Sequence, residues 1–145
     1  MEDKLTAQVT EVLWYKNQEY AMCTEPLELF LDQNPKIKFE SPHTACWRGY
    51  IGTWEFKGSP EKGYGLYLIE LLGYQRGQAE LTLKDVFPDS PHGVFAHWFS
   101  GTLRCPIGKQ LKYVHMGYGT TYEKDLFLEV KQGLFINESI TQNQQ

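Results

Sequence analysis

Alternating apolar and polar positions dominate this chain and predict a protein built mainly of β-strands. Ala79 to Lys84 alternates strictly, and Gln8 to Tyr15 has the composition of a strand. Lys16-Asn17-Gln18 is a turn signal, after which Glu19 to Cys23 returns as a second strand. Apolar residues fill both parities of Tyr64 to Tyr74. This pattern favours a central strand buried on both faces, with a helix as the main alternative.

The segment from Gly93 to Met116 is predicted to form a central β-hairpin. Pro106 presets the φ angle of a type I turn, and Gly108 can take the left-handed conformation that closes a three-residue loop. This loop pairs Leu103 with Leu111, and alternation then separates one buried face from one solvent face. The apolar face carries His97, Phe99, Leu103, Leu111, Tyr113 and His115.

Two histidines on that apolar face form the first candidate site. In the predicted hairpin, His97 and His115 are diagonal neighbours, close enough for their side chains to meet. Together with Tyr113 they would make a polar group inside an apolar cavity, able to orient a small ligand or hold a metal ion. The alternative is a pair of core histidines that are hydrogen-bonded to the backbone, as buried polar groups usually are.

The remaining pattern predicts an all-β, mainly antiparallel domain. About eight to ten short strands, separated by turn signals, favour a sandwich or a small barrel. One short helix is expected near residues 25–32, because Pro26 fits a first turn and Leu27, Phe30 and Leu31 fall on one helical face. We expect one domain over residues 1–136 and a polar, frayed tail over residues 137–145.

Composition narrows the class of protein and of partner. The 145 residues include 14 Lys and Arg against 18 Asp and Glu, a net charge of −4, and no basic run that would indicate nucleic-acid binding. No apolar run approaches the roughly 20 residues needed to cross a bilayer, and the charged N-terminus has no signal-peptide core. Three cysteines are too few and too scattered for a disulfide framework, so we expect a cytoplasmic protein.

No motif in the sequence indicates catalysis or a bound cofactor. His43 and Cys46 are the one close pair of metal-ligand residues, and Cys105 and His115 would have to complete a four-ligand site. That spacing differs from the paired motifs of structural zinc sites. Ser100 lies outside any nucleophile elbow. We therefore expect no catalytic residue, no metal and no cofactor.

Arg48 is a further candidate for ligand binding. It lies between Trp47 and Gly49, where its guanidinium can stack on an aromatic ring or hold an anion. The alternative is a surface arginine that covers the tryptophan.

Aromatic and glycine spacings in the chain resemble those of small uncharacterised bacterial all-β proteins. The resemblance covers about two thirds of the chain and is carried by Trp47-Arg48-Gly49-Tyr50, Trp54-Glu55, Leu66-Tyr67-Leu68, Trp98-Phe99-Ser100-Gly101 and Tyr122-Glu123. It implies a bacterial origin and a cytoplasmic accessory protein, and it brings no activity and no functional residue.

These observations favour a non-enzymatic module that binds another protein, for example in toxin neutralisation or defence. Aromatic residues make up 14% of the chain, and such residues suit binding surfaces. The alternative is a small-molecule binder or enzyme with an interior pocket lined by His97, Tyr113 and His115. We expect neither nucleic acid nor membrane among the partners.

Overall fold

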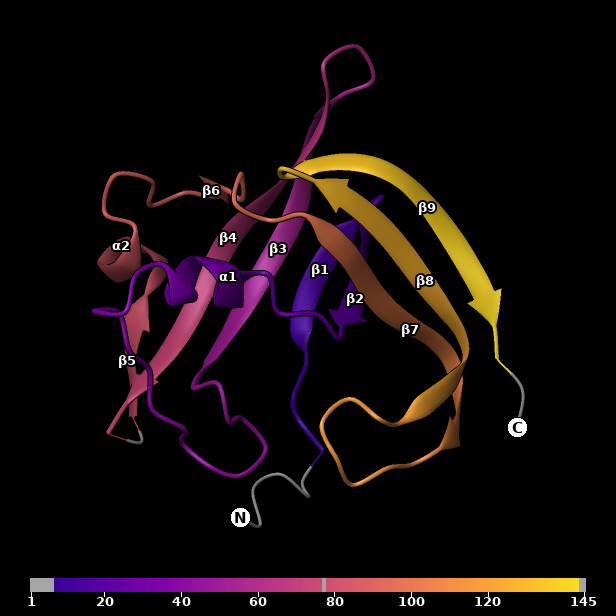
Figure 1. Ribbon diagram of the computed structural model, residues 1–145, viewed down its shortest axis with the longest axis horizontal. Coiled ribbons are helices and arrows are strands. Elements are labelled where there is room, and N and C mark those ends of the chain that lie inside the picture. The colour runs from indigo at the N-terminus through magenta and orange to yellow at the C-terminus, as the bar shows by residue number, and fades with distance from the viewer. Residues whose placement is uncertain (1–6, 77, 144–145) are drawn as a thin grey trace.

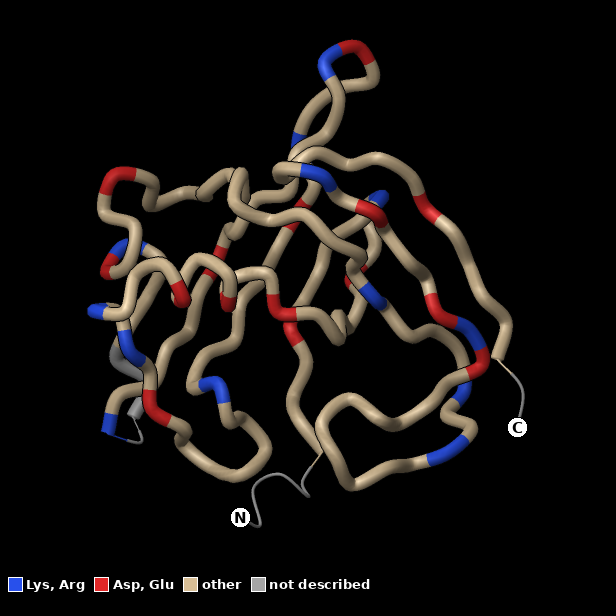
Figure 2. The backbone as a smooth tube through the Cα atoms, viewed as in Figure 1, with Lys and Arg blue, Asp and Glu red and all other residues tan. Residues whose placement is uncertain are grey.

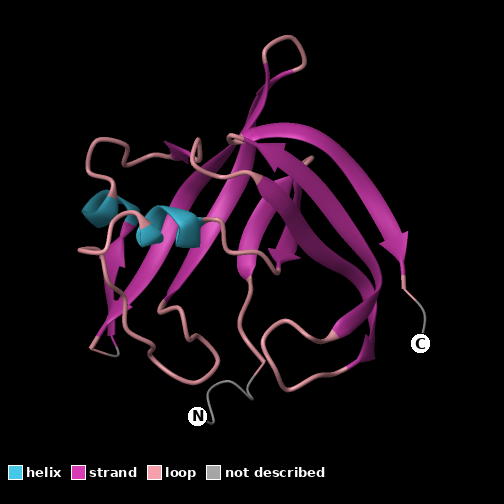
Figure 3. Ribbon diagram, in the orientation of Figure 1, coloured by secondary structure: helices cyan, strands magenta, loops and turns pink. Residues whose placement is uncertain are grey.

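Strands make up most of the computed structural model, which describes residues 7–76 and 78–143 (Figure 1). Over these residues the strands are β1 (Glu11–Tyr15), β2 (Gln18–Met22), β3 (Tyr50–Ser59), β4 (Gly63–Gln75), β5 (Gln78–Thr82), β6 (Val94–Phe95), β7 (Gly101–Lys112), β8 (Thr121–Lys131) and β9 (Leu134–Gln142). The helices are α1 (Leu27–Asp32) and α2 (Leu83–Val86), and Figure 3 shows how small they are beside the sheet. Neither helix of the described chain has the length and apolar character to span a membrane.

All nine strands of the described residues belong to one curved sheet. Seven are hydrogen-bonded in the order β2-β1-β3-β4-β9-β8-β7, and β5 and β6 pair with β4. The pairs are antiparallel except for β1 with β3, so the predicted all-β, mainly antiparallel class is confirmed. The sheet is not closed. In the described chain β4 and β9 pair at one position, Gly65 with Leu134. Over the same residues the end strands β2 and β7 form no ladder, although Cys23 N, just after β2, donates to Arg104 O of β7 at 2.8 Å.

Local sequence signals account for two hairpins and for the central strand. Lys16 and Asn17 form the β1–β2 turn with φ values of 50° and 63°, as a two-residue hairpin loop requires. Gln132 and Gly133, with φ values of 49° and 82°, turn the chain between β8 and β9. β4 pairs with β3, β5, β6 and β9, which confirms a central strand. The predicted burial on both faces is wrong, because Glu70 and Leu72 are exposed.

A second helix was not expected from the pattern. α1 confirms the helix predicted near residues 25–32, and its Leu27 is completely buried. α2 starts at a capping box in which Thr82 N donates to Asp85 Oδ2 at 2.8 Å. Because α2 has four residues, it is too short to show helical periodicity.

The predicted turn at residues 106–108 is wrong, because β7 continues through it. Pro106 lies opposite Asp125 of β8, on a strand at the end of the sheet order. An end strand tolerates proline, since the missing N–H costs no ladder hydrogen bond on its outer side. Gly108 has a φ of 87°, and the register with β8 shifts between Ile107 and Gln110. The glycine therefore makes a bulge in a continuous strand rather than a hairpin turn.

This correction changes the pairing of the core. Leu103 lies opposite Leu128 of β8, not opposite Leu111. Both Leu103 and Leu128 are completely buried. The core they join is formed by apolar side chains from both halves of the sheet: Leu13, Met22, Trp54, Leu66, Leu68, Leu126 and Val130.

The predicted frayed tail from residue 137 is wrong over residues 137–142. β9 runs to Gln142 and pairs with β8 along its length, for example Ile140 with Leu126 and Gln142 with Lys124. A polar composition did not prevent pairing, because β8 supplies a complete hydrogen-bonding edge.

Candidate functional site

The predicted histidine site is not formed. His97 is exposed before β7, with its ring 5.5 Å from that of Trp98. His115 is exposed in the loop after β7, with its ring edge-on to Tyr113 at 4.4 Å. Tyr113 is itself 49% exposed. Because β7 does not turn at Pro106, the two histidines do not face each other across a hairpin, and both are exposed instead of lining an interior pocket.

Arg48 is buried, which rules out the alternative of a surface arginine that covers the tryptophan. Its side chain is 4% exposed, and its Nη2 and Nε donate to Glu11 Oε2 at 2.7 Å and 3.2 Å. Its Nη1 donates to Val9 O at 2.8 Å. The guanidinium carbon lies 5.4 Å from the centre of the Tyr50 ring, within cation–π range. The anion that Arg48 holds therefore belongs to the chain itself.

Glu11 accepts four hydrogen bonds in a buried network, two of them from Arg48. It is fully buried, and Gly52 N donates to its Oε2 at 2.8 Å and Trp54 Nε1 to its Oε1 at 3.0 Å. Burial raises the pKa of Glu11, while Arg48 and these two N–H groups oppose the rise. Burial disfavours the charge of Arg48 as well, but Glu11 raises the pKa of Arg48 above its ordinary value. We assign this pair a structural role, joining β1 to the start of β3.

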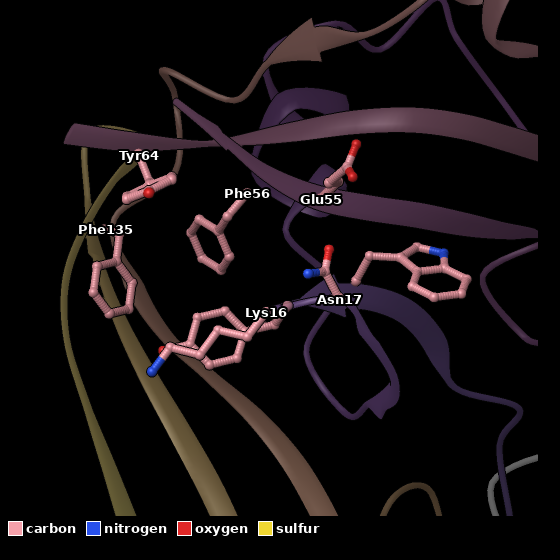
Figure 4. Close-up of a pocket in the computed structure, with 8 residues that line it drawn as sticks. Lys16, Asn17, Glu55, Phe56, Tyr64 and Phe135 are labelled. Atoms are coloured by element: carbon pink, nitrogen blue, oxygen red, sulfur yellow. The ribbon is translucent and has the colours of Figure 1, made fainter. Parts of the chain in front are cut away.

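A pocket of about 470 Å³ opens where three separate segments meet (Figure 4). The β1–β2 turn, the end of β3 with the start of β4, and the start of β9 each contribute to its wall. The lining residues are Trp14, Tyr15, Lys16, Asn17, Glu55, Phe56, Tyr64 and Phe135.

Aromatic rings make up most of the pocket wall. Tyr15, Phe56 and Phe135 form a three-ring cluster with centroid distances of 5.5 to 6.0 Å. Trp14 and Tyr64 are each 38% exposed. In Figure 4, Phe56, Tyr64 and Phe135 lie on one side of the pocket, and Asn17 and Glu55 lie on the other. A pocket with exposed tryptophan and tyrosine rings has the composition of a binding site.

The pocket carries one neutralised cation and one unpaired carboxylate. Lys16 Nζ lies 3.0 Å from Glu138 Oε1, which also accepts a hydrogen bond from Tyr15 OH. The bond from Tyr15 and the contact with Lys16 hold the pKa of Glu138 below its ordinary value. Glu55 is partly buried, and its carboxylate has no hydrogen bond or ion pair with the described residues. The described lining and its ion-pair partner therefore sum to a net negative charge.

A free strand edge begins at this pocket. Phe135 lines the pocket, and from there to Gln142 the edge of β9 turned away from β8 has no strand partner in the described chain. β9 forms the outer boundary of the molecule in Figure 1. Its exposed aliphatic residues are Leu134 (49%), Ile136 (50%) and Ile140 (56%). Glu138 is the one charged residue in the sequence of β9, LFINESITQ, and most of this strand is tan in Figure 2.

The described side chains form no recognisable catalytic group. No three His, Cys, Asp or Glu residues of residues 7–76 and 78–143 lie close enough together to hold a metal ion. Burial raises the pKa of Cys23 to about 11 and that of Cys105 to about 12, so neither thiol is activated as a nucleophile.

Sequence patterns had not indicated the pocket or the free edge. The pocket joins residues about 120 positions apart, from Trp14 to Phe135, which no local spacing connects. One usable signal was present, the aromatic pair Trp14-Tyr15 directly before a two-residue turn. No protein-family profile matches this chain, and neither the curated proteins nor the solved structures searched include a significant match.

Proposed function

We propose that this protein is a non-enzymatic module that binds another protein by adding an extended segment of that protein to the free edge of β9. The observation that carries the proposal is the open edge from Phe135 to Gln142, paired with β8 on one side only. Strand addition uses such an edge, since its unpaired N–H and C=O groups are ready to bond a further strand.

The composition of β9 supports this use of the edge. Natural sheets commonly protect an exposed edge with lysine or proline, and the sequence of β9, LFINESITQ, contains neither. Ile136 and Ile140 add apolar area that a partner strand can cover. Ile136 and Ile140 are at least half exposed, so packing in the core does not account for an apolar residue at either position. A cytoplasmic setting belongs to the proposal, because the three cysteines are all free thiols.

The test places a photo-crosslinking amino acid at Ile140, and separately at Leu72 as a matched control, in the native host. Leu72 is 41% exposed on β4, at a position that pairs with Ile51 of β3 and Thr82 of β5 and not with β9. We expect a discrete crosslinked protein from position 140 and none of the same mass from position 72. Adding Ile136→Lys should abolish that crosslink, because a charge on the edge opposes pairing.

Two results would contradict the proposal. Identical crosslinks from both positions would show that the edge is not selective. Crosslinking of the chain to a second copy of itself would identify self-pairing as the use of this edge, and the heterologous partner would be rejected. Urea unfolding of each variant shows whether a lost crosslink merely reports a lost fold.

A further inference from the structure

We propose that the aromatic pocket between the β1–β2 turn and β9 is a second binding site, whose ligand is an alkylated ammonium ion. The pocket uses residues that the β9 edge does not need, apart from Phe135 at its start. The inference is therefore independent of the proposed strand addition. It depends on the rings and on the distribution of charge around them.

The aromatic lining of the pocket is suited to a cation. Five aromatic side chains line one pocket, and Trp14 and Tyr64 keep 38% of their surface exposed. Aromatic faces attract cations, and methylated ammonium groups are recognised by several rings at once because they bring apolar methyl groups with the charge. Lys16 already uses this attraction inside the pocket, since its Nζ lies 5.3 Å from the centre of the Tyr15 ring.

Two carboxylates, those of Glu19 and Glu55, lie on either side of Trp14. Trp14 lies opposite Glu19 of β2 and opposite Glu55 of β3, so its ring and both acidic side chains share one face of the sheet. Glu55 lines the pocket, and Glu19 lies outside the lining, beside the indole. Neither carboxylate has an ion pair or a hydrogen bond with the described residues. Two negative groups flanking an exposed indole favour a positively charged ligand.

The nearby lysines do not cancel this charge. Lys16 is paired with Glu138 at 3.0 Å, and Figure 4 shows its chain extending away from Glu55. Lys57 follows Glu55 by two residues on β3, and its Nζ lies 5.5 Å from the centre of the Tyr67 ring. No ion pair within 4.0 Å joins either lysine to Glu55 over the described residues.

Other ligand classes fit less well. A metal ion needs several converging oxygen or nitrogen ligands, and no such group of three occurs in the described chain. A sugar needs many directed hydrogen bonds, whereas the lining offers few polar groups without a partner among the described residues: the Trp14 indole N–H, the Tyr64 hydroxyl, the Asn17 amide and the Glu55 carboxylate. A volume of about 470 Å³ also leaves room for a chain attached to the ammonium group.

The test is a titration of isotope-labelled protein with choline, followed by NMR. Its neutral isostere 3,3-dimethylbutan-1-ol and a neutral sugar, glucose, serve as the comparison ligands. We expect choline to shift the Trp14 indole signal and the amides around Asn17 and Phe135, with the isostere at least about fivefold weaker. Glu55→Gln should weaken choline binding about fivefold, and the matched change Glu70→Gln, at another exposed glutamate of the sheet, should leave it unchanged. Trp14→Leu should abolish the difference between choline and its isostere.

Each remaining outcome decides the question. Equal binding of choline and the isostere, preference for glucose, shifts at other residues, or no shift at millimolar choline would reject the site. An unfolded Glu55→Gln variant would be recognised from its spectrum, and the isostere comparison on the unchanged protein then decides alone. A peptide containing trimethyl-lysine distinguishes the two sources of the group. Tighter binding of the peptide than of choline assigns the site to a protein side chain, and the reverse order to a free small molecule.

Strand addition can fail while this site holds, or the reverse. Ile136→Lys and Ile140→Lys leave the side chains of Trp14 and Glu55 in place, so these variants should bind choline as the unchanged protein does. Their loss of a protein crosslink with retained choline binding would separate the two proposals.

Discussion

Replacing Glu11 by glutamine should remove one charge of the buried ion pair while keeping the size of the side chain. Glu11 is 0% exposed and the Arg48 side chain is 4% exposed, so the remaining guanidinium cannot recover the water that it lost on folding. Arg48 and Gly52 N both donate to Oε2 of Glu11. A carboxamide offers one oxygen and one NH₂ group, and it cannot accept at both of its ends as the carboxylate does.

The magnitude follows from this burial. Removing one partner of a buried ion pair costs about 3 to 5 kcal/mol of unfolding free energy. Because glutamine can still accept the hydrogen bond of the Trp54 indole, we expect Glu11→Gln at the lower end, ~3 kcal/mol. A domain of ordinary stability has about 5 to 15 kcal/mol in total, so this loss is a large share.

Urea unfolding, followed by tryptophan fluorescence, measures the change. We expect a lower midpoint with an unchanged m-value, since the surface exposed on unfolding stays the same. The control is Lys16→Met, which breaks the exposed pair with Glu138, where the side chains are 70% and 36% exposed. That change should cost less than about 1 kcal/mol. If Glu11→Gln also lowers the free energy of unfolding by less than about 1 kcal/mol, the buried ion pair contributes no more than an exposed one, and it does not hold β1 to β3.

Three further predictions concern titration, packing and thiol chemistry. Arg48→Met removes the positive charge that opposes the raised pKa of Glu11, and an acid whose folded-state pKa lies above its unfolded value gains stability as the pH falls. The stability deficit of Arg48→Met should therefore shrink from neutral pH toward pH ~5, and a deficit that grows would contradict this sign. Gly52→Ala should cost roughly 1 to 3 kcal/mol in urea unfolding, because the added Cβ would lie 2.6 Å from Glu11 Oε1; a cost near zero would show that the network yields easily. Burial raises the pKa of Cys105 to about 12 and that of Cys23 to about 11, so an aromatic disulfide reagent should label the folded protein slowly at neutral pH and all three cysteines quickly in urea; rapid labelling of the folded protein would contradict this burial.

Local chemistry explains which parts of the fold could be predicted. Asn17 and Gly133 are residue types that readily accept positive φ, and each closes a two-residue hairpin turn; the turn at Lys16-Asn17 is the one that the sequence predicts. Pro106-Ile107-Gly108 carries the same kind of signal and does not turn. A proline and a glycine also satisfy a bulged strand at the end of a sheet, and only the long partner strand β8 distinguishes the two outcomes.

The functional features depend on contacts that no local spacing encodes. Glu11 and Arg48 are 37 residues apart and meet because β1 pairs with β3 in parallel, a pairing without a hairpin signal. The open edge of β9 results from β4 and β9 diverging after a single pair, Gly65 with Leu134. Composition made residues 137–142 look like part of a frayed tail, whereas each of them pairs with β8.

Amide hydrogen exchange across β9, read residue by residue by NMR, tests the central claim most directly. An edge strand directs alternate N–H groups toward its one neighbour and toward solvent. We therefore predict that from Asn137 to Gln142, beyond the bulge at Ile136, slowly exchanging amides bonded to β8 alternate with fast amides on the open side. Uniform protection of all these amides in the isolated protein would mean that the edge is already covered, and strand addition at β9 would be excluded.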